Sequence, residues 1–276
     1  MKFISPSIWL GLFVCSLAAL AAGCAQKKVT VEKSAAIAAA ERLEHRASSA
    51  YAKGDAIGAA KDFQTAGQVY ESLAMLDAAA GVQLSLARID SDEGRIKEAV
   101  QRVTTVTALA QQGGILQTET ALLANGRAAA LHLQQKNNPA ADHSLTLAER
   151  LCGDSCNASS ALFILRANWF LATNDAASAK AKATQGLAQA QNSADKANAR
   201  RALAEAGLAL NELAQATSDA EQALQMDQTQ GNSLRVIADL DLLSRIYAKV
   251  GNPHQSARYA ALSQSARQAR QQLIRK

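Results

Sequence analysis

Small apolar residues recur at fixed distances from six turns along the chain. A small residue stands seven positions before each turn, and small, bulky and small residues follow at plus five, nine and twelve. The turn at Gly54, for example, lies between Ala47 and the set Ala59, Phe63 and Ala66. The other turns fall at residues 94, 136, 174, 211 and 251, and the sixth unit is expected to use Ser244, Ala257 and Ala261. This pattern predicts two packed helices in each unit, with small residues where the helices cross.

Composition supports helices and disfavours sheets. Hydrophobic residue types make up 49% of the 276 residues, but only 4% are aromatic and only three residues are proline. Alanine is the most frequent residue, and it is the strongest helix former. A large sandwich or barrel would need aromatic and β-branched residues at its strand positions. We therefore expect an all-α protein.

The turns contain residues that end and begin helices. Gly54, Gly94 and Gly251 are expected to end the first helices of their units, where a positive φ is needed. Asp55 and Asp175 are expected to cap the second helices. Asn138 and Asn252 each precede a proline, a pairing typical of an N-cap followed by the first helical residue.

Together these features resemble the tetratricopeptide repeat (TPR), an antiparallel helix pair with small residues at the crossing. The turns are 37 to 42 residues apart, longer than the usual repeat of about 34 residues, and the consensus Trp and Pro are missing. The resemblance covers residues 34–276 and implies an α-solenoid of about six repeats. It further implies that the first helix of each unit forms a concave inner wall that binds extended segments of partner proteins or acidic chain termini. Carried over by phase, the expected partner-binding residues are Arg88, Arg127, Asn168, Arg201 and Arg245; the alternative is that they are ordinary solvated side chains.

The N-terminus has the pattern of an export signal. Lys2 is followed by an apolar run from Ile8 to Ala22, which is too short to span a membrane. The sequence Ala22-Gly23-Cys24 at its end resembles the bacterial lipobox, although Ala21 stands where that pattern prefers Leu. The resemblance implies a signal peptide over residues 1–23 and acyl chains on Cys24. An ordinary signal peptide with a chance cysteine is the alternative.

Residues 24–33 are expected to tether this lipid anchor to the repeats, or else to begin the first helix. Ala25, rather than Asp, follows the cysteine. By resemblance to other lipoproteins, this favours the outer membrane, with the repeats facing the periplasm.

Two cysteines remain after export and anchoring. Cys152 and Cys156 enclose a short loop, and in an oxidising periplasm they are expected to form a disulfide that staples an inter-helix turn. A redox-active pair is the alternative, but the spacing differs from Cys-x-x-Cys and no thioredoxin-like strand pattern precedes it.

Charge does not indicate nucleic-acid binding. The formal net charge is +5, but residues 255–276 hold five basic residues and no acid, which leaves a nearly neutral body. The last helix, about 253–274, contains Arg258, Arg267 and Arg270. It is interpreted as the polar cap of the array, or alternatively as a contact for anionic lipids or an acidic partner.

No catalytic, metal-binding or cofactor-binding motif is found in the sequence, so an enzyme is not expected. His45 is expected on a solvated face, and Trp169 and Phe170 are expected in the core between repeats, with a ligand platform as the alternative. The sequence therefore predicts a membrane-anchored scaffold for envelope, pilus or secretion assembly. The alternative is a thiol-active accessory factor that uses Cys152 and Cys156.

Overall fold

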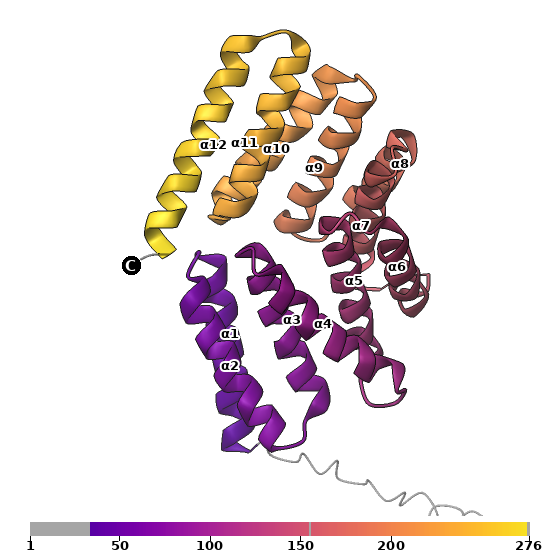
Figure 1. Cartoon of the computed structure of the whole chain (residues 1–276), viewed down its shortest axis with the longest axis vertical. Coiled ribbons are helices and arrows are strands. Elements are labelled where there is room, and N and C mark those ends of the chain that lie inside the picture. Colours follow the sequence, from indigo (N-terminus) through magenta and orange to yellow (C-terminus); the bar gives the residue numbers. More distant parts are fainter. Residues whose placement is uncertain (1–33, 155, 275–276) are drawn as a thin grey trace, which may run out of the picture. The chain divides into compact units, whose positions relative to one another are not determined.

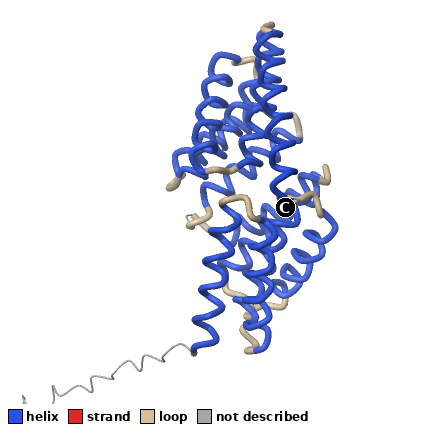
Figure 2. Tube along the Cα trace, turned by 90° about the vertical axis from the view of Figure 1, so that its left-hand side faces the viewer, coloured by secondary structure: helices blue, strands red, loops and turns tan. Residues whose placement is uncertain are grey.

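Twelve α-helices make up the part of the chain that the structure, a computed structural model, describes: residues 34–154 and 156–274. The expected signal peptide, Cys24 and the tether over residues 24–33 lie outside the described residues. No strand occurs in the described ranges (Figure 2), so the predicted all-α fold is confirmed. The helices are α1 Ala35–Ala52, α2 Ala56–Ser72, α3 Leu76–Asp92, α4 Ile96–Gln111, α5 Thr118–Gln134, α6 Asn138–Cys152, α7 Ser159–Ala172, α8 Ala176–Gln189, α9 Ser193–Ala209, α10 Leu213–Gln230, α11 Ser233–Val250 and α12 Pro253–Ile274.

Each odd-numbered helix packs against the even-numbered helix that follows it, which gives six helix pairs (Figure 1). All twelve helices belong to the unit spanning residues 35–276. The fold of this unit is an α-solenoid of helix-pair repeats, as predicted. In the described part of the chain, no helix combines the length and the apolar character needed to cross a membrane.

All six predicted turn residues have a positive φ. Three are the glycines Gly54, Gly94 and Gly251, with φ between 78° and 89°. The others are Lys136, Asn174 and Asn211, with φ between 57° and 63°. A left-handed residue ends one helix and reverses the chain within two or three residues, so the next helix packs directly against the first.

Side-chain caps begin several of the second helices. Asp55 Oδ1 accepts a hydrogen bond from the Gly58 backbone N–H, and Asp175 Oδ1 accepts one from the Ser178 N–H, as predicted. Asn252 Oδ1 caps α12 in the same way, by accepting from the Gln255 N–H.

The predicted cap at Asn138 is wrong by one residue. Asn137 caps α6, because its Oδ1 accepts from the Ala140 N–H. Asn138 is instead the first residue of the helix, and its side chain donates to the Ala172 carbonyl at the end of α7. This interaction with the next repeat removes Asn138 from the capping position.

The predicted crossing residues of the first five repeats are buried. The bulky residues Phe63, Val103 and Leu145 are buried beside them. Alanine at these sites lets the helix axes approach closely, and the bulky side chains fill the space towards the neighbouring repeat. At the repeat positions, the fully buried alanines are Ala47, Ala59, Ala66, Ala87, Ala99, Ala129, Ala141, Ala148, Ala167, Ala179, Ala183, Ala204, Ala216, Ala220 and Ala223.

The prediction for the sixth repeat is wrong by one position. Ala257 and Ala261 are exposed. The crossing of α11 and α12 is made instead by Ser244 and Ser256, whose hydroxyls each donate to the other residue's carbonyl, at 3.0 Å in both cases. Ser256 stands five residues after Gly251, so the helix follows the common spacing and the alanines fall on its exposed side.

Candidate functional site

Five of the odd-numbered helices, α3 to α11, line a cavity of about 460 Å³, here called the inner groove. Its lining residues all come from α3, α5, α7, α9 and α11, together with Ala158 just before α7. The first helices of the repeats therefore form a common wall, as the TPR resemblance implied. The groove has an apolar floor that includes Leu122, Leu162 and Leu165, and Leu123 is 49% exposed there.

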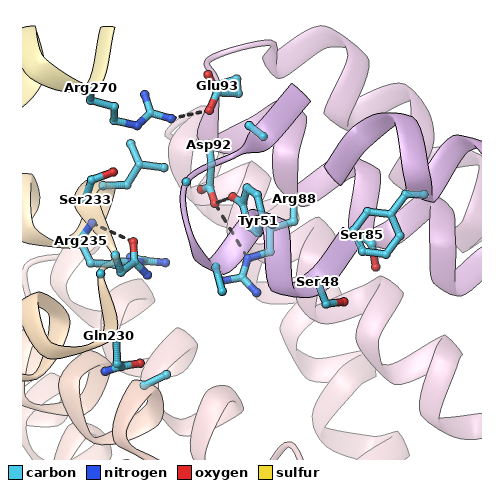
Figure 3. A pocket seen from close by; sticks show the side chains of 18 of the residues that line it. Ser48, Tyr51, Ser85, Arg88, Asp92, Glu93, Gln230, Ser233, Arg235 and Arg270 are labelled. Carbon is cyan, nitrogen blue, oxygen red and sulfur yellow. Dashed lines mark hydrogen bonds and ion pairs between the residues drawn. The ribbon is translucent and has the colours of Figure 1, made fainter. Parts of the chain in front are cut away.

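A second cavity of about 330 Å³, here called the arginine cavity, adjoins the inner groove. The two cavities share Arg88, Arg127 and Arg235 in their linings. One side of the arginine cavity comes from α1 to α3 and α5, and the other side comes from the start of α11 and Arg270 of α12. Figure 3 shows Arg88 and Arg235 extending from opposite sides into this space.

Arg88 and Arg127 lie at the junction of the cavities, where the sequence predicted partner-binding residues. Arg88 is held over the Tyr51 ring, 5.4 Å from its centroid, and lies 3.9 Å from Asp92. The Tyr51 hydroxyl donates to Asp92, and burial together with this carboxylate raises the tyrosine pKa. Arg127 has no side-chain ion pair or hydrogen bond within the described residues. Burial, and secondarily the positive charge of Arg88, lowers the pKa of Arg127 to about 10.

Asn168 and Arg201 also line the inner groove, but their side chains are in different situations. Asn168 is exposed to the groove. The Arg201 guanidinium is bound by two buried carboxylates, Asp239 at 2.6 Å and Asp227. Burial raises the pKa of Asp239 to about 6, against the opposing effect of Arg201. Arg201 is therefore engaged within the protein, and its partner-binding role stays a prediction.

Arg245 does not line either cavity. Its side chain is exposed and forms an ion pair with Glu205, a residue of the inner groove. Arg245 thus lies next to the predicted wall, where it neutralises a groove carboxylate. A direct partner contact at Arg245 stays a prediction.

Arg235 and Leu123 were not identified from the sequence. Arg235 lies in the first turn of α11, nearly three turns before Arg245, the position that was predicted on that helix. If the inward-facing positions of α11 had been followed back to the start of that helix, the residues beside Arg235 would have been included. The exposure of Leu123 depends on how the neighbouring helices pack around it, and the spacing of apolar residues along one helix does not reveal that packing.

The predicted disulfide joins Cys152 and Cys156, with a Cα–Cα distance of 5.2 Å, between α6 and α7. Ser159 Oγ donates to the Cys156 carbonyl and accepts from the Cys156 N–H, so the start of α7 is fixed to the bridged loop. A thiol role for the pair stays a prediction.

The aromatic cluster and the basic last helix have largely structural contacts. Trp169 Nε1 donates to the Asn138 carbonyl at 3.0 Å, which links the third and fourth repeats, and the Trp169 ring meets Phe170 edge to face. Phe170 lines a cavity beside the disulfide, so a ligand platform there stays a prediction. Arg267 pairs with Asp241, and Arg270 pairs with Glu93 at the end of α3. Two of the three arginines considered for lipid contact are therefore bound within the protein.

His45 is exposed on α1, as expected. Within the described ranges no group of His, Cys, Asp and Glu residues is arranged to hold a metal ion.

No protein-family model matches the sequence, and no curated protein matches it. Similar solved structures exist. BtubC from P. vanneervenii matches with a TM-score of 0.55 at 16% identity, over 86% of this chain and 92% of that one. A thermophilic TPR protein from Thermus thermophilus matches with a TM-score of 0.54 at 20% identity, over 77% of this chain and 99% of that one. At these identities the likeness concerns the fold, and the fold of this chain is an α-solenoid of TPR-like helix pairs.

Proposed function

We propose that the protein is a membrane-anchored periplasmic scaffold that binds extended segments of partner proteins in the inner groove. The main support is the groove itself, in which the exposed Leu123 lies beside a polar and a cationic side chain, Asn168 and Arg127, that have no hydrogen bond or ion pair within the described residues. Leu123 offers an apolar contact, while Arg127 and Asn168 offer donors within the same groove. An extended peptide can use both features, because its side chains alternate in direction while its carbonyls accept hydrogen bonds.

Binding energy in such a groove is expected to concentrate in a few contacts. Arginine and large apolar side chains in a partly desolvated pocket are typical hot spots. The Arg127 guanidinium has five donors and no acceptor bound to it within the described residues, so a partner carbonyl or carboxylate gains access without first breaking an ion pair. Arg201 and Arg245 would have to leave Asp239 and Glu205, respectively, to do the same.

A photo-crosslinking amino acid at Leu123 in intact cells tests this proposal. We expect one or a few defined protein crosslinks that are lost when Arg127→Gln is added. Leu73 on the α2–α3 connection is 45% exposed and does not line the inner groove, so it is the matched control position. Equal crosslinking from both positions, or a Leu123 product that is insensitive to Arg127→Gln, would contradict binding in the groove.

The anchor and location belong to the same proposal and rest on the sequence pattern at Cys24. We propose that Cys24 is acylated and that the protein is held at the outer membrane, facing the periplasm, where it serves envelope, pilus or secretion assembly. Several acyl chains on one cysteine are enough for stable anchoring, whereas one chain is marginal. Metabolic labelling with an alkyne fatty acid should mark the wild-type protein and not Cys24→Ser. Labelling that persists in Cys24→Ser, or is absent from the wild type, would contradict acylation at this position, and fractionation of the membranes reports the location separately.

A further inference from the structure

The arginine cavity has an uncompensated positive charge. Four arginines and two acids line it, which leaves an excess of two positive charges. Asp92 lies beside Arg88, and Glu93 is bound by Arg270. Arg127 and Arg235 have no acidic partner within the described residues, and this pair accounts for the excess.

These arginines come from three helices that are distant in the sequence and converge on one space. Arg88 is on α3, Arg127 is on α5, and Arg235 is in the first turn of α11. In Figure 3, Arg235 reaches across the cavity towards Arg88. Burial lowers the pKa of both Arg127 and Arg235. The next cause is the positive charge of Arg88 for Arg127 and of Arg201 for Arg235, while Asp92 opposes the shift in both. Like charges brought together in this way disfavour one another, whereas Arg201 and Arg270 each have a carboxylate partner.

The surrounding groups suit a tetrahedral oxyanion. The hydroxyl-bearing side chains of Ser48 and Ser233 line the same cavity, as does Ser85, whose hydroxyl donates to the Gly81 carbonyl. The start of α11, an 18-residue helix, also borders it, and the positive end of a helix dipole favours an anion. Three guanidinium groups from different directions match the several acceptor oxygens of a phosphate, whereas one arginine fork already satisfies a planar carboxylate. A phosphoryl group carries a charge of about −1.5 to −2 at neutral pH, which matches the excess.

We propose that the arginine cavity is a binding site for a phosphate-type dianion, either inorganic phosphate or a phosphomonoester, held by Arg88, Arg127 and Arg235. The bound group would connect the sixth repeat, through Arg235, to the second and third repeats, through Arg88 and Arg127. The site thus depends on the approach of helices that are more than a hundred residues apart in sequence. Its existence does not depend on the partner segment proposed for the inner groove.

Calorimetric titration of the full-length protein with inorganic phosphate, at constant ionic strength set with chloride, tests the site directly. We expect saturable binding that weakens at least tenfold in Arg127→Gln and in Arg235→Gln. Arg150 on α6 is exposed and lies away from the cavity, so Arg150→Gln is the matched control and should bind normally. No binding by the wild type, or equal weakening in the control, would overturn the proposal.

The charge requirement is tested by pH. Sulfate should bind with similar strength at pH 8 and pH 5, while inorganic phosphate should weaken several-fold, because it is mostly the dianion at pH 8 and mostly the monoanion at pH 5. Phosphate affinity that stays constant over this range would refute recognition of a dianion.

Amide hydrogen exchange on the wild type gives a readout that needs no variant. Phosphate should slow exchange both at the start of α11 and in α3 and α5. Protection on only one side of the cavity, or on neither, would refute a bridging anion.

A phosphoserine peptide distinguishes the two sources of the group. Binding tighter than that of inorganic phosphate supports a group delivered on a partner segment. Weaker binding supports a free small ligand in the same site.

Discussion

Arg201 holds two buried carboxylates, and this arrangement allows a quantitative prediction for Arg201→Met. The Arg201 side chain is 12% exposed and Asp239 is 0% exposed, so the substitution leaves Asp239 and Asp227 without their counter-charge in a poorly hydrated site. Removing one partner of a buried ion pair costs about 3–5 kcal/mol. In a domain of this size, each kcal/mol lowers Tm by about 2–4 °C, so we expect a decrease of roughly 6–20 °C.

The comparison with Arg245→Met makes the test specific. Arg245 also forms an ion pair on an odd-numbered helix, but its side chain is 55% exposed. Exposed pairs contribute about 0–1 kcal/mol, so this variant should unfold close to the wild type. Urea unfolding followed by circular dichroism at 222 nm, a wavelength that reports helix, measures both variants. The cost of Arg201→Met should also shrink as pH is lowered, because protonation neutralises the orphaned carboxylates.

A triple variant tests the cause of the effect. Asp227→Asn and Asp239→Asn remove the two charges that Arg201→Met leaves unpaired, so adding them should recover part of the lost stability. If Arg201→Met unfolds within about 1 kcal/mol of the wild type, or no differently from Arg245→Met, the assignment of Arg201 to the internal network is refuted.

Three further substitutions test the packing and electrostatics. Arg127→Met should stabilise the ligand-free protein by about 1–3 kcal/mol, because the charged form of Arg127 is disfavoured at every pH below its folded pKa of about 10. An unchanged or lower urea midpoint for this variant would contradict the prediction. Ala179→Leu in α8 should cost about 1–3 kcal/mol by overpacking a fully buried crossing, whereas Ala181→Leu at an exposed position of the same helix should cost little; equal urea midpoints would contradict the crossing model. Asp239 has a folded pKa of about 6, above its unfolded value. Its contribution to the free energy of unfolding is therefore present below about pH 4 and is lost as the pH rises to about 6. If the stability of the wild type and of Asp239→Asn changed equally with pH between 4 and 6, this prediction would be contradicted.

The positions of the repeats could be predicted from the sequence because the signals are local. A left-handed turn residue and an N-cap each act within four residues. Alanine at a crossing indicates that two helix axes lie close together. The turn residues at 54, 94, 136, 174, 211 and 251 all adopt positive φ for this reason. In the last repeat Ala257 and Ala261 resembled a crossing, but they stand one position beyond the common spacing and therefore fall on the exposed side of α12.

The site was less predictable because pairing between charges depends on tertiary distances. The spacing of residues along the helices placed Arg127 and Arg201 on the inner wall, where the structure has them, but it predicted partner binding for both. Arg201 differs because Asp227 and Asp239, 26 and 38 residues later, lie against it in the folded protein. Arg235 was missed because its importance arises only when α11 comes opposite α3 and α5.

These differences divide the arginines of the inner helices into two physical classes. Arg201 and Arg245 each have a carboxylate and contribute to the array itself, with the buried pair contributing more. Arg127 and Arg235 have no ion pair within the described residues, and a bound anion that paired with them would stabilise the fold by linkage. A ligand that supplies this charge acts on helices of the second, third and sixth repeats together. Occupancy of the arginine cavity would consequently be linked to the geometry of the adjoining inner groove, since Arg88, Arg127 and Arg235 line both.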